Sequence, residues 1–227
     1  YYNSAMGRNA LYYNTTGYYN SAMGMGTLYY NVSATSSTAI GFRAGQGTAS
    51  YNAGELTLVG TDALYSITTG AENVTALGYR AGYANTSGAN NIYLGYQAGD
   101  NVTTGSNNII LGYDIDAPAV DSSNILNIGN LIFGTGINGT GTTLSSGNVG
   151  IGTTSPYELL SVSGRAVITA TTTLGLSSTA QQAGLQIGYG GLCADNDGTC
   201  VASTTGRVSA VSFVTAASDL AENYYSD

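Results

Sequence analysis

Residues 1–24 read YYNSAMGRNALYYNTTGYYNSAMG, so the phrase YYNSAMG that begins at Tyr1 returns unchanged at Tyr18. Its last two letters, an apolar residue followed by glycine, continue along the chain after the paired tyrosines are lost. The glycines of these pairs stand at positions 7, 24, 41, 60, 78, 95 and 112. Seven units with so little drift in their spacing indicate a structural repeat.

Each unit has the composition of a short strand followed by a turn. A few residues of alternating small and large side chains lead into the glycine, and a polar segment of Asn, Thr, Ser and Gly closes the unit. A helix is disfavoured because these residues destabilise it and because no apolar stripe recurs at a spacing of 3.6. The repeat therefore predicts an all-β fold, a parallel β-roll (β-solenoid) of about seven 17–19-residue coils stacked at about 4.8 Å. Its interior is expected to hold Ala, Ile, Leu, Val and Met side chains.

The first two units match at many positions, which predicts that like residues lie above one another. Stacked aromatic rings and amides of this kind stabilise parallel in-register sheets. The tyrosines either pack at the edge of the sheet or at a seam between chains, which we favour, or form a contact surface whose flat rings bind sugars. The expected pairs are Tyr1 over Tyr18, Tyr2 over Tyr19, Tyr12 over Tyr29, Tyr13 over Tyr30 and Asn14 over Asn31.

The charge inventory excludes several classes of function. The chain contains neither Lys nor His, and its net charge of −8 offers no basic stripe for nucleic acid. Without histidine, neither a Ser-His-Asp nor a Cys-His nucleophile can form, and imidazole metal ligands are absent. No run of about 18 or more apolar residues occurs, so no transmembrane segment is expected in this sequence.

The 13 carboxylates leave glycoside hydrolysis by a carboxylate pair as the remaining enzyme class. Several of them lie at expected turns and connectors with no shared motif, and solvated turn residues explain them better. We therefore expect no enzyme, no catalytic residue and no cofactor. The acids concerned are Asp62, Glu72, Asp100, Asp114, Asp116 and Asp121.

A coil this short, made mostly of small residues, encloses little apolar volume, so we expect chains to associate. The segments TAIGFRAG (38–45), TALGYRAG (75–82) and IYLGYQAGDNVTTGSNNIILGY (92–113) resemble the head repeats of trimeric autotransporter adhesins and the related repeats of phage tail-fibre proteins. This resemblance covers about residues 1–113. It implies a left-handed β-roll, with three rolls packed around a threefold axis as a homotrimer.

The repeat is expected to end after Tyr113, at DIDAPAVDSS. We divide the chain into a head-like β-roll (1–113), a neck with short strands (114–147), an elongated β stalk (148–190) and a disulfide loop with a C-terminal strand region (191–227). The segment GNVGIGTTSPYELLSVSGRAVI (147–168) resembles stalk segments of tail fibres and bacterial surface fibres. Its alternation from Leu160 to Gly164 predicts a half-buried strand. We expect the chain to be part of a longer protein.

Two further motifs lie near the end of the chain. Cys193 and Cys200 flank the segment ADNDGT, and a disulfide that closes a surface loop in an oxidising compartment is the favoured interpretation. Asp195, Asn196 and Asp197 resemble the start of a calcium loop, but the remaining ligands are missing, so a polar turn is favoured over a calcium site.

The sequence thus predicts a non-catalytic, extracellular structural fibre or filament subunit of a bacterial surface, acting as an adhesin. The alternative is the receptor-binding tail fibre or tailspike of a phage, located on the virion tail, with glycan-cleaving activity as a less favoured variant. The expected partners are further copies of the chain, as a homotrimer or polymeric fibre, and surface glycans or a host receptor. Neither nucleic acid nor a metal is an expected partner, apart from the weak calcium candidate.

Overall fold

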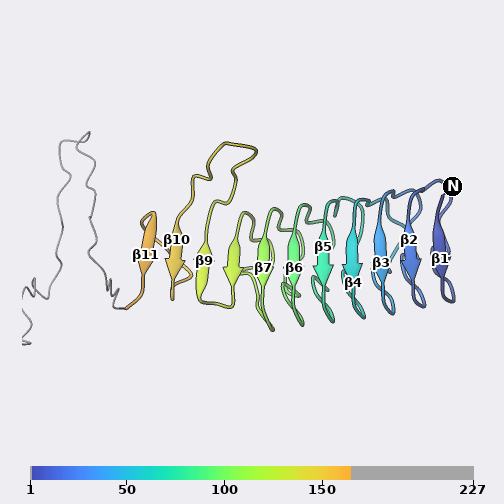
Figure 1. Ribbon diagram of the computed structural model, residues 1–227, viewed down its shortest axis with the longest axis horizontal. Helices are drawn as coiled ribbons and strands as arrows, with labels where there is room; N and C mark the ends of the chain where they lie inside the picture. The colour runs from blue at the N-terminus through green and yellow to red at the C-terminus, as the bar shows by residue number, and fades with distance from the viewer. Residues whose placement is uncertain (1, 165–227) are drawn as a thin grey trace, which may run out of the picture. The chain divides into compact units, whose positions relative to one another are not determined.

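The computed structural model describes residues 2–164, in which every regular element is a β-strand of three residues (Figure 1). Together the strands form one 11-stranded sheet in chain order. They are β1 (Ser4–Met6), β2 (Ser21–Met23), β3 (Thr38–Ile40), β4 (Thr57–Val59), β5 (Thr75–Leu77), β6 (Ile92–Leu94), β7 (Ile109–Leu111), β8 (Leu126–Ile128), β9 (Ile132–Gly134), β10 (Val149–Ile151) and β11 (Leu160–Val162).

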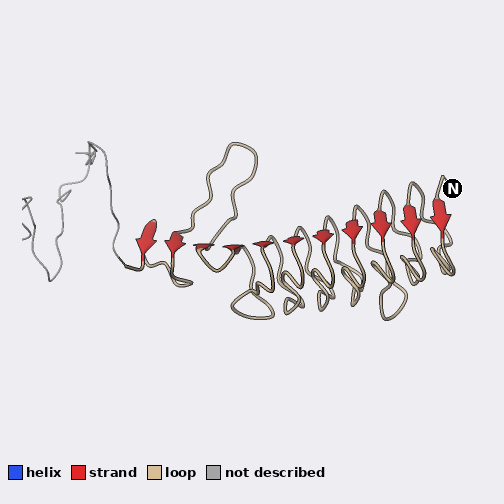
Figure 2. Cartoon of the chain, turned by 60° about the horizontal axis from the view of Figure 1, so that its bottom comes forward, coloured by secondary structure: helices blue, strands red, loops and turns tan. Residues whose placement is uncertain are grey.

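The pairing of β1 to β8 confirms the predicted all-β solenoid of about seven turns. Each of these strands pairs in parallel with the next, and the paired residues are one repeat apart, as in Ala5 with Ala22 and Ala22 with Ala39. Figure 2 shows the strands along one side of the described coils, with the turns of the coils on the other side. Each coil therefore contributes one strand to a common ladder.

The coils continue beyond residue 113, where the sequence predicts the end of the repeat. β8 pairs in parallel with β7, and Ile109 lies opposite Leu126, so the step of the repeat is kept. The segment DIDAPAVDSS belongs to this coil, and its Ile115 and Ala117 are buried in the core. The pair Ile128-Gly129 preserves the apolar-glycine ending of the repeat, which is the signal that identifies the extra coil.

After β8 the chain reverses direction. β9 pairs antiparallel with both β8 and β10, and β10 pairs in parallel with β11. The long loop between β9 and β10 projects beyond the neighbouring coils (Figure 1). The predicted alternating strand at residues 160–164 is observed as β11.

Burial alternates along each strand, and the interior is narrow. From β2 onward the middle residue of every strand is buried. In the parallel strands β2–β8 the first and third residues are exposed or half-buried. Ala22, Ala39 and Ala76 occupy this inward position in three of the coils. The prediction of inward-facing methionines is wrong, because Met6 and Met23 are exposed on the outer side of the sheet. Alanines share the interior with larger side chains such as Leu58, Tyr93 and Ile110, while further apolar side chains lie on the outer side of the strands.

A column of glycines brings successive coils into backbone contact. Gly7, Gly24, Gly41, Gly60, Gly78, Gly95 and Gly112 have φ angles of 134–138°, a region that side chains strongly disfavour. From Gly7 to Gly95, a Cβ atom at each position would overlap the carbonyl oxygen of the equivalent glycine in the next coil. The glycine of the repeated phrase is thus required by both conformation and space.

The phrase that follows each of these glycines also has a structural explanation, which the segment TALGYRAG illustrates. After Gly78, Tyr79 is exposed, and Arg80 adopts a left-handed backbone conformation with φ of 55°. Ala81 is fully buried, and Gly82 is left-handed with φ of 61° where a Cβ atom would clash with the buried Tyr93 ring. The pattern Gly-aromatic-x-Ala-Gly is therefore a corner of the coil, with an outward ring and an inward alanine.

Buried asparagines fasten one coil to the next immediately before the strand. The side-chain nitrogen of Asn108 donates to the carbonyl oxygen of Ser122 at 2.7 Å, and its oxygen accepts from the backbone N–H of Ile125 at 3.0 Å. Both groups belong to the next coil, so one amide satisfies a donor and an acceptor that would otherwise be unpaired. The same pair of hydrogen bonds is made by Asn20 and Asn91, which are also buried, and by Asn3, which is exposed.

The glycine column generates a first prediction. Gly95→Ala should destabilise the solenoid by more than about 3 kcal/mol, because strain at φ of 136° adds to overlap with the next backbone. The matched control is Gly129→Ala, where φ is 58° and nothing lies within 4 Å of the new methyl group, with an expected loss of about 1–2 kcal/mol. Denaturant unfolding followed by circular dichroism measures both, and equal losses would contradict the role of the column.

A second prediction concerns the asparagine fastening. Asn108→Ala should lower the free energy of unfolding by about 2–4 kcal/mol, since it leaves the buried N–H of Ile125 and the partly buried carbonyl of Ser122 unpaired. Its neighbour Asn107, exposed to solvent and left-handed with φ of 59°, provides the control. Asn107→Gly retains that backbone conformation and should change stability by less than about 1 kcal/mol. Chemical denaturation of the two variants compares them, and a neutral Asn108→Ala would refute the fastening.

Candidate functional site: side-chain ladders on the solenoid surface

Four tyrosines of the first two coils form a continuous aromatic cluster on the surface. Tyr12 stacks on Tyr29 with ring centroids 5.2 Å apart, and Tyr13 stacks on Tyr30 at 5.3 Å. Within each coil the two neighbours meet edge to face, at 5.0 Å for Tyr12 with Tyr13 and 4.7 Å for Tyr29 with Tyr30. Burial, followed by the nearby Tyr13, raises the pKa of Tyr29, so its phenol stays protonated at neutral pH.

The tyrosines that open the repeated phrase form a separate group. Tyr2 stacks on Tyr19 at 5.5 Å, and Tyr18 meets Tyr19 edge to face at 5.0 Å. Tyr1 lies outside the described residues. Asn14 and Asn31 occupy equivalent positions, but Asn31 is fully buried and its side-chain oxygen accepts from the backbone N–H of Ala34 within its own coil.

Two further aromatic ladders were not anticipated from the sequence. Tyr79, Tyr96 and Tyr113 stack in succession, with centroids 5.2 Å and 5.0 Å apart, and Tyr65 stacks on Tyr83 at 5.2 Å. The first three follow the glycine of the repeat directly, in GYR, GYQ and GYD, so their equivalence was visible in the sequence. Aromatic ladders therefore extend from the first coils to the seventh.

Stacking limits what these rings can bind. Tyr96 lies between two parallel rings, so neither of its faces is free for a flat ligand. In the paired ladders each ring has one face covered in the same way. The ladders consequently offer mainly ring edges and hydroxyl groups to the solvent.

The positions of later coils that are equivalent to Tyr2 and Tyr19 carry a polar ladder, and we call such a line of equivalent positions a column. The side-chain nitrogens of Asn73, Asn90 and Asn107 each donate to the side-chain oxygen of the next asparagine, ending at Asn124, at 3.0, 3.1 and 3.3 Å. All four are left-handed, with φ of 55–60°, a conformation that asparagine tolerates better than most residues. One column of the solenoid thus carries stacked rings at one end and linked amides at the other.

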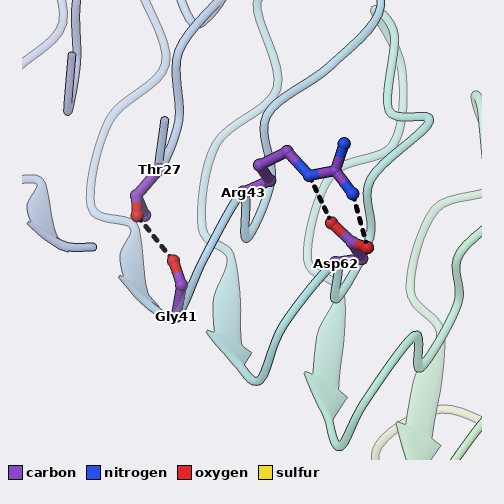
Figure 3. A network of polar contacts seen from close by, with 4 residues as sticks. All are labelled: Thr27, Gly41, Arg43 and Asp62. Carbon is purple, nitrogen blue, oxygen red and sulfur yellow. Dashed lines mark hydrogen bonds and ion pairs between the residues drawn. The ribbon is translucent and has the colours of Figure 1, made fainter. Parts of the chain in front are cut away.

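An ion pair links the third and fourth coils (Figure 3). The guanidinium of Arg43 donates to both carboxylate oxygens of Asp62 at 2.8 Å. The hydrogen bonds to Asp62 raise the pKa of Arg43, which remains charged. In the same view the Thr27 hydroxyl donates to the carbonyl oxygen of Gly41 at 2.8 Å. Arg80, one coil beyond Asp62, lies 4.1 Å from the centroid of the Tyr83 ring.

The inner tyrosines have a structural role. Tyr51 and Tyr93 are fully buried, and burial raises the pKa of each hydroxyl. The Tyr51 hydroxyl donates to the carbonyl oxygen of Gly45, and the Tyr93 hydroxyl accepts from the side-chain nitrogen of Asn85 at 3.0 Å. Asn85 and Asn31 lie within glycosylation sequons, yet both are fully buried and hydrogen-bonded in turns, so the folded chain does not expose them for modification.

The structure brings some of the predicted turn acids together. The pKa of Asp116 is raised, first by partial burial and then by the charge of nearby Asp100. Asp62 is paired with Arg43 instead. Among residues 2–164, no cluster of His, Cys, Asp or Glu has the arrangement of a metal site. Cys193, Cys200 and the calcium candidate Asp195–Asp197 lie outside the described residues.

A shallow groove lies along the first three strands. It has a volume of about 470 Å³ and is lined by Ser4, Ala5, Met6, Ser21, Ala22, Met23, Thr38 and Ile40. None of these side chains ionises. The groove therefore offers hydroxyl groups and apolar surface but no carboxylate for glycoside hydrolysis.

No family model, curated protein or solved structure matches the chain. In the part of the chain that the structure describes, no helix has the length and apolar character needed to cross a membrane.

A third prediction follows from Asp116. Its raised pKa means that the folded state favours the protonated carboxyl, so ionisation of this group disfavours folding once the pH exceeds the pKa of the unfolded chain. Asp116→Asn should therefore unfold at a higher denaturant concentration than the unaltered chain at neutral pH. The difference should shrink as the pH falls and the native carboxyl becomes protonated. Unfolding curves across this pH range measure it, and an advantage that does not change with pH would contradict the electrostatic cause.

Proposed function

We propose that the protein is a non-enzymatic structural subunit of an extracellular fibre, in which solenoids associate as a homotrimer and present their side-chain ladders outward. The proposal rests on the outer side of the strand sheet. The strands of this surface contain no charged residue, and in β6–β8 both outward columns are aliphatic, an apolar area that a single chain in water leaves uncovered.

The last strands carry the observation that supports association most strongly. In β10 and β11 the buried middle residues are Gly150 and Ser161, while the larger apolar side chains lie on the outer side. A strand that stabilises the core of its own chain has its large apolar side chains on the inner side, whereas β10 and β11 have them on the outer side. The exposed residues are Val149, Ile151, Leu160 and Val162. A partner surface that covers them would remove this apolar area from water.

The same apolar surface extends to the preceding parallel strands. In β6, β7 and β8 both outward positions of each strand are aliphatic, and they are exposed or half-buried: Ile92, Leu94, Ile109, Leu111, Leu126 and Ile128. In β1 to β5 the first outward position is instead a hydroxyl residue: Ser4, Ser21, Thr38, Thr57 and Thr75. We place the seam between copies on β6–β11 for this reason.

Charge also favours contact between identical chains on this side. The net charge of −8 would oppose self-association if acidic residues lined the seam. None of the strands β1–β11 contains a charged residue. The repulsive charges of the described coils therefore lie on turns, away from the strand face, and the apolar columns of several copies can approach one another.

The extracellular location and the threefold symmetry are supported by the resemblance of the repeats to autotransporter heads and tail fibres. The same resemblance leaves the tail fibre of a phage as the second candidate. Adhesion to surface glycans would depend on the free edges and hydroxyls of the ladders. A gene neighbourhood of baseplate components would favour the phage, and an adjacent cell-envelope anchor would favour the bacterial surface.

A fourth prediction tests the seam. The purified chain should have three times its 23.0 kDa mass by light scattering, and Leu94→Asp should reduce this to the mass of one chain. The aspartate would bury an unpaired charge in the seam, which association cannot tolerate. The matched control is Met23→Asp at the equivalent position of β2, which is similarly exposed but lies beside hydroxyl residues.

Met23→Asp should remain trimeric. Circular dichroism of both variants checks that the solenoid stays folded. A monodisperse monomer for the unaltered chain would refute the trimer, and loss of association in Met23→Asp alone would move the seam to the first coils.

A further inference from the structure

The surface tyrosines are arranged as pairs of nearly parallel rings one coil apart. For Tyr12 with Tyr29, Tyr13 with Tyr30 and Tyr65 with Tyr83, the centroids are 5.2, 5.3 and 5.2 Å apart and the ring planes differ by 7°, 8° and 5°. Tyr79, Tyr96 and Tyr113 continue the same geometry at 5.2 and 5.0 Å. Each pair brings two phenols together from equivalent positions of adjacent coils.

This arrangement is fixed by the backbone. The rings lie on turns, and hydrogen bonds between successive coils hold these turns together. The backbone N–H of Tyr13 donates to the carbonyl oxygen of Tyr29 at 3.1 Å, and the N–H of Gln97 donates to the carbonyl oxygen of Tyr79 at 2.8 Å. Tyr12, Tyr13, Tyr79, Tyr96 and Tyr113 are exposed, while Tyr29, Tyr30, Tyr65 and Tyr83 are half-buried, so every ring of the stacked pairs keeps some contact with solvent. Close and lasting phenol pairs that an oxidant reaches are what the coupling of two phenol rings requires, because proximity replaces a diffusive encounter.

We propose that the stacked surface tyrosines are sites of oxidative cross-linking, in which a peroxidase-type one-electron oxidant and hydrogen peroxide join rings of neighbouring coils as dityrosine. Each phenol loses one electron and its hydroxyl proton to give a phenoxyl radical. The two radicals join through a carbon–carbon bond between positions ortho to the oxygens. Loss of the two ring hydrogens as protons and reprotonation of the two oxygens restore the aromatic phenols. Overall, two tyrosines and one hydrogen peroxide give one dityrosine and two waters.

The structure distinguishes reactive from unreactive tyrosines. Tyr51 and Tyr93 are fully buried, so an external oxidant does not reach them. Tyr157 is highly exposed but has no stacked partner among the described residues, so it lacks the geometry that favours coupling. These three residues are internal controls for the geometry.

A cross-link of this kind would join one coil covalently to the next. It closes a loop of a single coil, as from Tyr12 to Tyr29, and so restricts the unfolded chain as a disulfide of similar span does. The link lies within one chain and is therefore independent of whether copies associate as a trimer.

The experiment treats the full chain with peroxidase and hydrogen peroxide and then maps cross-linked peptides by proteolysis and mass spectrometry. The expected products are the links between stacked rings, each lacking two hydrogens: Tyr2–Tyr19, Tyr12–Tyr29, Tyr13–Tyr30, Tyr65–Tyr83 and links among Tyr79, Tyr96 and Tyr113. The cross-linked chain should unfold at a higher denaturant concentration than the untreated chain. An equal mixture of isotopically light and heavy chains should give these links within single chains.

Two conservative variants sharpen the test. Tyr29→Phe retains the stacked ring but lacks the phenol, so it should abolish the Tyr12–Tyr29 link and retain Tyr13–Tyr30. Tyr30→Phe should show the opposite pattern. The proposal is overturned by any of three results: no link between stacked pairs under conditions that couple free tyrosine, links mainly between light and heavy chains, or unchanged yields of Tyr12–Tyr29 relative to the same reaction on the denatured chain.

Discussion

The backbone contact between glycines of successive coils is the constraint on which the solenoid depends. At this point the coils approach so closely that a methyl group would overlap the next carbonyl oxygen, and the φ angles of 134–138° exclude ordinary side chains. A slip of one residue would move another residue type into this position. The glycine column therefore fixes the register of the coils, and the register in turn places equivalent side chains above one another.

Register alone does not decide which ladder forms, as one column demonstrates. Tyr2 and Tyr19 at its beginning are stacked, whereas Asn73, Asn90, Asn107 and Asn124 are joined by amide hydrogen bonds. The backbone is left-handed at all six positions. The same scaffold thus accepts two chemistries, and the outer surface can vary while the glycines and the buried asparagines maintain the stacking.

The period, the strand type and the in-register stacking could be predicted from the sequence because each depends on local composition. Which of the two alternating sets of side chains points into the core could not be predicted, because small and large residues alternate in the same way in either orientation. Met6 and Met23 lie outside because the narrow coil places residues such as Ala22 inward. The eighth coil was missed because DIDAPAVDSS resembles a connector, although Ile128-Gly129 keeps the period.

The candidate site was predictable only in part, for a related reason. The stacking of Tyr12 and Tyr13 could be predicted because they occur beside an exact repetition. Tyr79 and Tyr96 belong to degenerate units, and only alignment on the glycine shows that their positions are equivalent. The buried role of Asn108 depends on hydrogen bonds to the next coil, which no local pattern reveals. Long-range contacts therefore account for most of what the sequence left open.

The narrow coil connects the fold to the proposed assembly. Alanine occupies many of the inward positions beside larger residues such as Leu58 and Ile110, and this narrow interior does not take up all the apolar side chains of the repeat. The remaining ones lie on the outer side of the strands. Where that side also carries Ser or Thr, as at Thr57, the hydroxyl groups can form hydrogen bonds with water. Where both columns are aliphatic, as at Ile92 and Leu94, and where Ser161 turns inward while Leu160 faces out, another apolar surface is the better partner. The ladders of tyrosine and asparagine occupy other columns, so the proposed association of copies would leave them exposed on the proposed fibre.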